Sequence, residues 1–101
     1  MSSIDTSVSG DVATIRVSAA IDGDVAEQMK TAFSALPLDK IKLLVLDFSA
    51  VPFIGSAGLE KLLLFYKRVS SNGGAIEVRG ASRELQELFQ ELRLDLLFKI
   101  V

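Results

Sequence analysis

Residues 44–59, LVLDFSAVPFIGSAGL, decide the fold, because they join an unbroken apolar run to the start of a leucine-rich segment. The apolar run within residues 41–48 does not alternate with polar residues, which is typical of a strand at the centre of a sheet with helices on both faces. After a loop through Pro52, helical spacing begins at about Ser56 and predicts one apolar face, made of Leu59, Leu62, Leu63 and Tyr66. The segment therefore predicts a buried strand, a loop and a helix.

Towards the N-terminus, the chain predicts a hairpin followed by a helix. Residues 4–8 and 12–19 have the pattern of two strands around the turn Ser9-Gly10-Asp11, and the second strand alternates as one near a sheet edge does. Asp22-Gly23-Asp24 offers an N-cap for a first helix, which Pro37 stops near Leu36.

Towards the C-terminus, glycines and a serine mark the element boundaries. Asn72-Gly73-Gly74 ends the second helix, residues 75–79 predict a short strand, and Ser82 caps a third helix. Residues 97–101 form either a last strand or a segment that docks on the core. The order ββαβαβα(β) predicts one α/β domain over residues 1–101, with a mixed β-sheet whose central strands are mostly parallel and flanked by helices. We expect a core built on Phe33, Leu44, Leu46, Leu59, Leu63 and Leu88.

Composition excludes several classes of function. The 101 residues include no cysteine and no histidine, which removes thiol chemistry, cysteine or histidine zinc sites and histidine acid/base catalysis. A net charge of -2 gives no basic stripe for DNA or RNA, so we expect no nucleic-acid partner. The apolar runs are too short to span a bilayer and the first residues do not resemble a signal peptide, so we expect a cytoplasmic protein without membrane insertion.

Residues 44–59 also resemble the core motif of STAS domains, the family of bacterial anti-sigma-factor antagonists. The shared pattern is an apolar strand ending in Asp-x-Ser (Asp47 to Ser49), a short apolar loop, a Ser/Thr turn with glycine and a leucine-rich helix. Ile21-Asp22 before the first helix and Gly73-Gly74 before the fourth strand match the layout of the family too. The resemblance covers essentially the whole chain.

What the resemblance implies is a partner-switching regulator that is not an enzyme. In this family a serine at the start of the second helix, here Ser56, is phosphorylated by a GHKL-type serine kinase that is often itself the anti-sigma factor. A phosphatase would be a further partner, and no cofactor or metal is implied; the sequence indicates no oligomeric state. The implied partner-binding residues are Asp22, Gly23, Gly55, Ser56, Ala57, Gly58 and Glu60.

The turn departs from the commonest form of the motif, Asp-Ser-Ser-Gly. Gly55 replaces the acidic residue and Ala57 replaces the second hydroxyl, which leaves Ser56 as the only hydroxyl in the turn. Ser56 is then either a substitute phosphoacceptor or a plain helix N-cap. Asp22 and Asp47 are either a carboxylate pair or separate acceptors of local hydrogen bonds, with an interface role favoured for Asp22.

Two other functions stay open at this point. One is a non-phosphorylated STAS subunit of a transport or sensory complex, which would account for Ala57. The other is a small enzyme or nucleotide-binding module, against which the missing histidine, cysteine and phosphate-binding loop all count.

Overall fold

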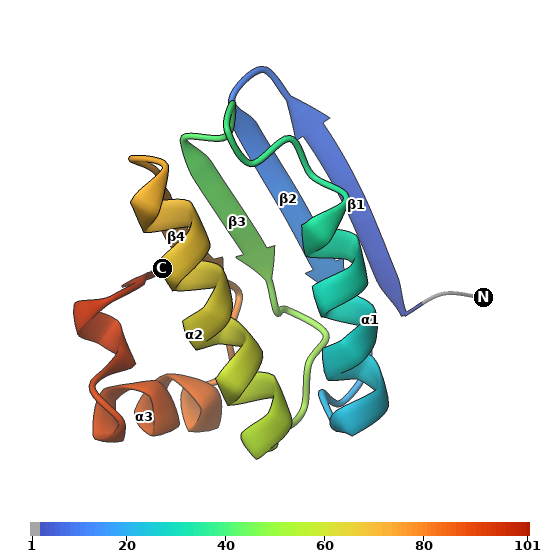
Figure 1. Ribbon diagram of the computed structural model, residues 1–101. Helices are drawn as coiled ribbons and strands as arrows, with labels where there is room; N and C mark the ends of the chain where they lie inside the picture. Colours follow the sequence, from blue (N-terminus) through green and yellow to red (C-terminus); the bar gives the residue numbers. More distant parts are fainter. Residues whose placement is uncertain (1–2) are drawn as a thin grey trace.

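A five-stranded sheet forms one layer of the molecule, as the computed structural model shows over the residues it describes, 3–101. The strands lie side by side in chain order, β1-β2-β3-β4-β5 (Figure 1). Antiparallel pairing joins β1 to β2, and every later pair is parallel. The mixed, mostly parallel sheet predicted from the sequence is confirmed. The strand bounds are β1 Ile4–Ser9, β2 Val12–Val17, β3 Leu43–Asp47, β4 Ala75–Arg79 and β5 Lys99–Ile100.

Local signals set the bounds of the helices. Asp22 accepts a hydrogen bond from the Val25 N–H at 2.9 Å and caps α1, and Ser82 caps α3 in the same way. After α2 the chain turns at Gly73, whose φ of +79° suits glycine. None of the helices among residues 3–101 is long and apolar enough to cross a bilayer. The helix bounds are α1 Gly23–Ser34, α2 Ser56–Ser71, α3 Arg83–Glu91 and the 3₁₀ helix η1 Leu94–Leu96.

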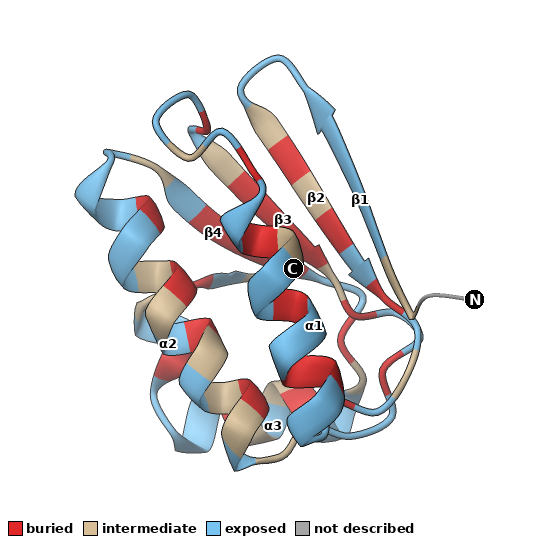
Figure 2. Cartoon of the chain, turned by 45° about the vertical axis from the view of Figure 1, so that its right-hand side comes forward, coloured by how far each residue is buried: buried red, intermediate tan, exposed pale blue. Residues whose placement is uncertain are grey.

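The core lies between the sheet and the pair α1 and α2, which run in front of it in Figure 1. The rings of Phe33 and Phe65 stack at 4.2 Å between the two helices. Leu44 and Leu46 of β3 are fully buried on this face, as the sequence predicted. Figure 2 shows the alternation of β2, whose Ala13, Ile15 and Val17 are buried. Burial on this face, rather than helix propensity, holds the layers together.

The predicted core is wrong at Leu63, which is 41% exposed. Residues 62–66 are all apolar, so their spacing does not decide which side of α2 faces the sheet. The stack of Phe65 on Phe33 settles the rotation and turns Leu63 outward. For the same reason Leu59 is only partly buried, and Leu88 of α3 is partly buried as well. The residues of α2 that are buried are Gly58, Leu62, Phe65 and Val69.

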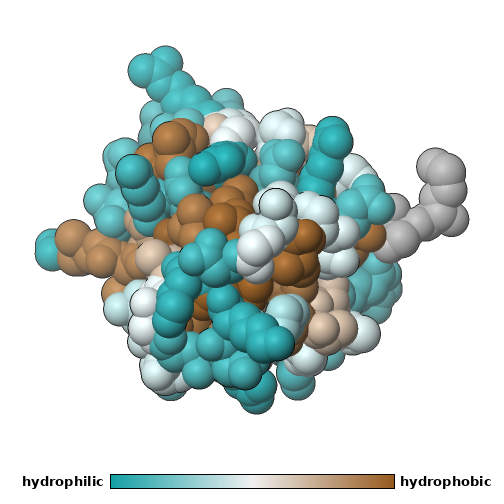
Figure 3. All heavy atoms as spheres, turned by 90° about the horizontal axis from the view of Figure 1, so that it is seen from above, coloured by the Kyte–Doolittle hydropathy of each residue, from teal (hydrophilic) through white to brown (hydrophobic). Residues whose placement is uncertain are grey.

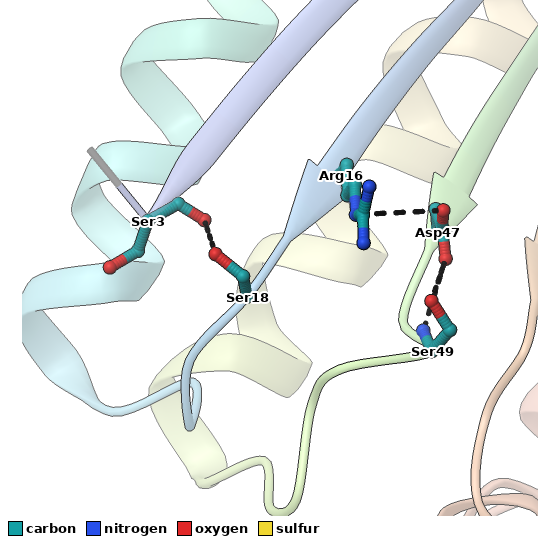
Figure 4. A network of polar contacts seen from close by, with 5 residues as sticks. All are labelled: Ser3, Arg16, Ser18, Asp47 and Ser49. Carbon is teal, nitrogen blue, oxygen red and sulfur yellow. Dashed lines mark hydrogen bonds and ion pairs between the residues drawn. The ribbon is translucent and has the colours of Figure 1, made fainter. Parts of the chain in front are cut away.

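Within residues 3–101, α1 and α2 lie on the same face of the sheet, whereas the apolar run of β3 predicted helices on both faces (Figure 1). Figure 4 views the sheet with the translucent helices behind the strands, and Arg16 and Asp47 on the near side. Val45 is only 3% exposed on this face, where its neighbours across the sheet are Thr14 and Glu77. On this face Val45 therefore lies between two polar residues of the neighbouring strands, where the apolar run predicted a helix.

Apolar side chains are also visible at the end of the molecule seen from above in Figure 3. There, hydrophobic residues lie at the centre of the view within a rim of hydrophilic ones. In Figure 1 this is the end where α2 finishes, and both α1 and α2 begin at the opposite end. The two ends of the sheet therefore present different parts of the helices, and the residues singled out by the motif belong to the end where the helices begin.

Candidate functional site

One isolated β-bridge joins the loop before α1 to the loop before α2. Ile21 pairs in parallel with Ile54, and its N–H donates to the Phe53 carbonyl at 2.8 Å. The Gly55 N–H donates to the Ile21 carbonyl at 2.9 Å. Both isoleucines are buried. These bonds bring the Asp22 loop and the Ser56 turn together, although more than 30 residues separate them in the chain.

At the start of α1, the side chain of Asp22 acts as the helix N-cap, and Asp24 lies in the first turn. Asp22, Gly23 and Asp24 are all exposed. The Asp22 carboxylate therefore has a structural task, and it still presents its outer surface to solvent. Its negative charge also suits the positive end of the helix dipole.

At the start of α2, the N-cap is Gly55, and no side chain accepts a hydrogen bond there. Ser56 is the first residue of the helix and is exposed. The interpretation of Ser56 as a plain N-cap is wrong, because the cap lies one residue earlier and has no side chain to offer. The first N–H groups of α2 are thus left without a side-chain acceptor, and the only hydroxyl of the turn lies beside them.

The other residues of the turn differ in exposure. Ala57 is partly buried against the core, and Glu60 is exposed. Gly58 is buried, and a Cβ built on it would lie 2.6 Å from Cγ2 of Ile21 and 2.7 Å from Cγ1 of Ile54. The α2 backbone therefore approaches the bridge as closely as only glycine allows. Gly58 thus lets α2 pack closely against Ile21 and Ile54, while Ser56 and Glu60 are exposed to solvent.

An apolar hollow of about 310 Å³ opens between the two helix starts. Three of the residues that form it, Ala20, Ile21 and Phe53, are not among the partner-binding residues predicted from the sequence. Phe53 is 51% exposed in the structure. The sequence signal that could have marked it is a large aromatic residue beside Pro52, in the short apolar loop of the motif. The hollow is lined by Ala20, Ile21, Asp22, Phe53 and Gly55.

Asp47 belongs to a separate polar group on the open face of the sheet. Its Oδ1 accepts hydrogen bonds from the Ser49 hydroxyl at 2.7 Å and from the Ser49 N–H at 3.0 Å, and Arg16 lies 4.0 Å from its Oδ2 (Figure 4). The two hydrogen bonds from Ser49 lower the pKa of Asp47, the Arg16 charge lowers it further, and burial acts against them. Asp22 bonds instead to Val25, so the two carboxylates serve separate local hydrogen bonds.

Comparisons with known proteins agree with this geometry. The model of the STAS domain family matches residues 3–101. Among solved structures, TM1081 of Thermotoga maritima superposes with a TM-score of 0.83 at 22% identity, covering 96% of this chain and 84% of that one. An anti-sigma factor antagonist from Mycobacterium paratuberculosis gives 0.82 at 28% identity, over 96% and 82%. The phosphorylated form of SpoIIAA, a Bacillus cell fate determinant, gives 0.77 at 18% identity, over 97% and 90%.

Proposed function

The chain belongs to the STAS domain family, and on this premise we propose that it is a cytoplasmic partner-switching regulator of the anti-sigma-factor antagonist type. Its partner is an anti-sigma factor that is also a GHKL-type serine kinase, and phosphorylation of Ser56 ends the complex. The observation that carries the proposal is the start of α2, where an exposed Ser56 lies beside N–H groups without a side-chain acceptor.

The docking surface is the pair of helix starts with the hollow between them. The half-exposed Phe53 ring and the apolar walls supply area that gains free energy when water is removed. Asp22 and Glu60 place charge beside it, which favours a basic partner and sets its orientation. An apolar centre with a polar rim is the usual composition of a protein–protein interface.

Phosphate on Ser56 is compatible with the fold and incompatible with the complex. The helix dipole and the first N–H groups of α2 favour a negative group at this point, so the domain tolerates it. At the interface, roughly two added charges would have to lose their water against the partner. With Asp22 already charged on the facing loop, the modified surface keeps its hydration instead, and the partner is released.

The experiment combines mass spectrometry of the protein from its native cell with binding assays of Ser56 variants. We expect phosphate on Ser56, loss of partner binding by a few kcal/mol in Ser56→Asp, and full binding by Ser56→Ala. Ser70→Asp, at the other end of α2, is the matched control for added charge and should bind as the parent does. Circular dichroism checks that all variants fold. If Ser56→Asp binds normally and Ser56 is never phosphorylated, the proposal is wrong.

The second candidate is a STAS subunit that is never phosphorylated and that holds a transport or sensory complex together. Ala57 favours it, because this residue packs partly into the core where the commonest motif carries a hydroxyl. In that case Ser56→Asp and Ser56→Ala would bind the partner equally well. In both cases the chain catalyses no reaction and binds nucleotide weakly if at all. In the first case ATP is bound by the partner kinase. Micromolar ATP binding to this chain alone, seen by calorimetry, would contradict both.

A further inference from the structure

The outer edge of β1 has backbone groups that point away from the sheet. The Ser18 N–H donates to the Ser3 carbonyl at 2.9 Å, so residue 3 belongs to a hydrogen-bonded pair. Such pairs alternate along an antiparallel ladder, which assigns Asp5 and Ser7 to bonds with β2. The N–H and C=O groups of Thr6 and Val8 therefore face outward at the edge of the strand order.

This edge lacks the usual features that prevent pairing. The β1 sequence IDTSVS contains no proline and no lysine, and its six residues pair with β2 without a bulge. Figure 2 shows the strand exposed along nearly its whole length. Exposed edges normally carry charge, proline or a bulge to stop them from adding further strands. Here the single charge, on Asp5, lies near one end of the strand.

The helix side of this edge combines a groove with a protruding apolar side chain. Thr6 and Val8 pair with Ile15 and Ala13, so all four side chains are on the face that carries α1. Val8 is 46% exposed. A groove of about 470 Å³ runs beside Thr6, between β1 and α1. It is lined by Ile4, Thr6, Glu27, Gln28, Thr31 and Ala32.

We propose that a second copy of this chain pairs with β1 edge to edge, antiparallel, with Ser7 on the two-fold axis. Thr6 then lies opposite Val8 of the second copy, and Val8 opposite its Thr6, which gives four backbone hydrogen bonds. The Val8 side chain of each copy points into the groove beside Thr6 of the other. A two-fold interface needs such self-complementarity, because the same surface must supply both the projecting Val8 side chain and the groove that receives it.

Charge specifies this register. Centred on Ser7, the pairing places each Asp5 opposite Ser9 of the other copy, and the two Asp5 Cα atoms are about 13 Å apart. Centred on Asp5, it would place the two carboxylates directly opposite each other, which is destabilising. The short interface predicts a weak dimer that depends on concentration. This surface is separate from the Asp22 and Ser56 site, so the inference does not rest on the proposed function.

Cysteine cross-linking tests the register, because the chain has no cysteine of its own. Across the axis, Ser7 faces its counterpart in a non-hydrogen-bonded pair with Cα atoms about 4.5 Å apart, within the range of a disulfide. We expect Ser7→Cys to form a disulfide-linked dimer on mild oxidation. Ser9→Cys, on the same strand and also exposed, would be about 13 Å from its counterpart and should stay monomeric. Equal cross-linking of the two variants would overturn the register.

Sedimentation equilibrium of the whole chain tests the dimer itself. We expect reversible dimerisation below about 1 mM protein, and a dissociation constant at least tenfold higher for Val8→Lys. Leu96→Lys is the control, since it removes an even more exposed apolar side chain, 74% exposed, at a distant surface. Monomer alone at every concentration, or an equal loss in the two lysine variants, would overturn the inference.

Discussion

The starts of α1 and α2 lie together and are built differently. The first is closed by a side chain, since the Asp22 carboxylate accepts the Val25 N–H. The second begins after Gly55, where no side chain accepts a hydrogen bond from the first N–H groups of the helix. The bridge between Ile21 and Ile54 holds both in one surface. A third α-helix start, at Ser82, is capped like the first, so the uncapped start of α2 is the exception among the three α-helices of residues 3–101.

The difference shows how one surface can combine a fixed part with a changeable part. At the start of α1 a side chain of the protein itself, Asp22, accepts one of the first N–H groups. The start of α2 gains stability from any acceptor that arrives, whether water, a partner or a phosphate on Ser56. Three kinds of substitution should therefore change the free energy of unfolding by different amounts and in different directions. They add a cap to α2, remove the cap of α1, or force the two loops apart.

The largest effect should come from separating the two starts. In Gly58→Ala the new methyl group would overlap Ile21 and Ile54, whose contacting atoms lie close to their own backbones, and we expect a loss of about 1–3 kcal/mol in the free energy of unfolding. Gly23→Ala is the matched control on α1, because nothing lies within 4 Å of its added Cβ. Urea denaturation should show the control as stable as the parent, or slightly more so. Equal stability of the two variants would mean that the bridge tolerates side chains at position 58.

Opening the closed start should cost less. Asp22→Ala removes the cap of α1, and we expect a loss of about 1 kcal/mol in the free energy of unfolding. Asp22→Asn keeps an acceptor at the same place and should recover most of that stability. Partner binding, measured for both variants, separates the role of Asp22 as a helix cap from its role in the interface. If Asp22→Asn is stable but binds the partner poorly, the charge of Asp22 acts at the interface. If both variants unfold like the parent, the cap contributes nothing.

Closing the open start should have a smaller effect of opposite sign. Gly55→Asp supplies the missing cap, and its Cβ would lie 3.6 Å from the Ile21 carbonyl oxygen, which is an ordinary contact. We expect a gain of a few tenths of a kcal/mol in thermal or urea unfolding. The same side chain would stand at the edge of the hollow, so binding of an apolar partner group should weaken. A loss of stability would show that the backbone at position 55 needs glycine.

The smallest effect concerns a carboxylate outside both helix starts, and it serves as a reference for them. The pKa of Asp47 is lowered in the folded protein by its hydrogen bonds from Ser49 and by Arg16. The stability it contributes is therefore present above the ordinary pKa of 3.8 and is lost as the pH falls through the lowered value. Asp47→Asn should flatten that acid decline in urea titrations and leave partner binding unchanged. An unaltered acid profile would contradict the assignment.

Element boundaries could be predicted from the sequence because their signals are local. Asp22, Ser82 and Gly73 each act on the few residues beside them, and the structure places the helix ends within two residues of the expected positions. The position of the motif residues at one end of the sheet could also be expected, since loops after parallel strands meet there.

Features that depend on contacts between distant residues could not be predicted in this way. The outward turn of Leu63 follows from the stack of Phe33 on Phe65, and no periodicity within α2 carries that information. The pairing of Ile21 with Ile54, and with it the hollow under Phe53, arises from two loops with no strand pattern. Val45 is buried in a polar setting, so an apolar run alone could not tell side-chain cover from helix cover.

The strand order carries a kinetic consequence. Because β1 to β5 lie in the sheet in the order of synthesis, no strand has to insert between two that are already paired. The β1–β2 hairpin can form first, and each later strand finds its neighbour already present as the chain emerges. Assembly can thus proceed in one direction, from the N-terminal hairpin to β5. Chains released early in synthesis should already protect the β1–β2 amides from hydrogen exchange once β3 and α2 have emerged.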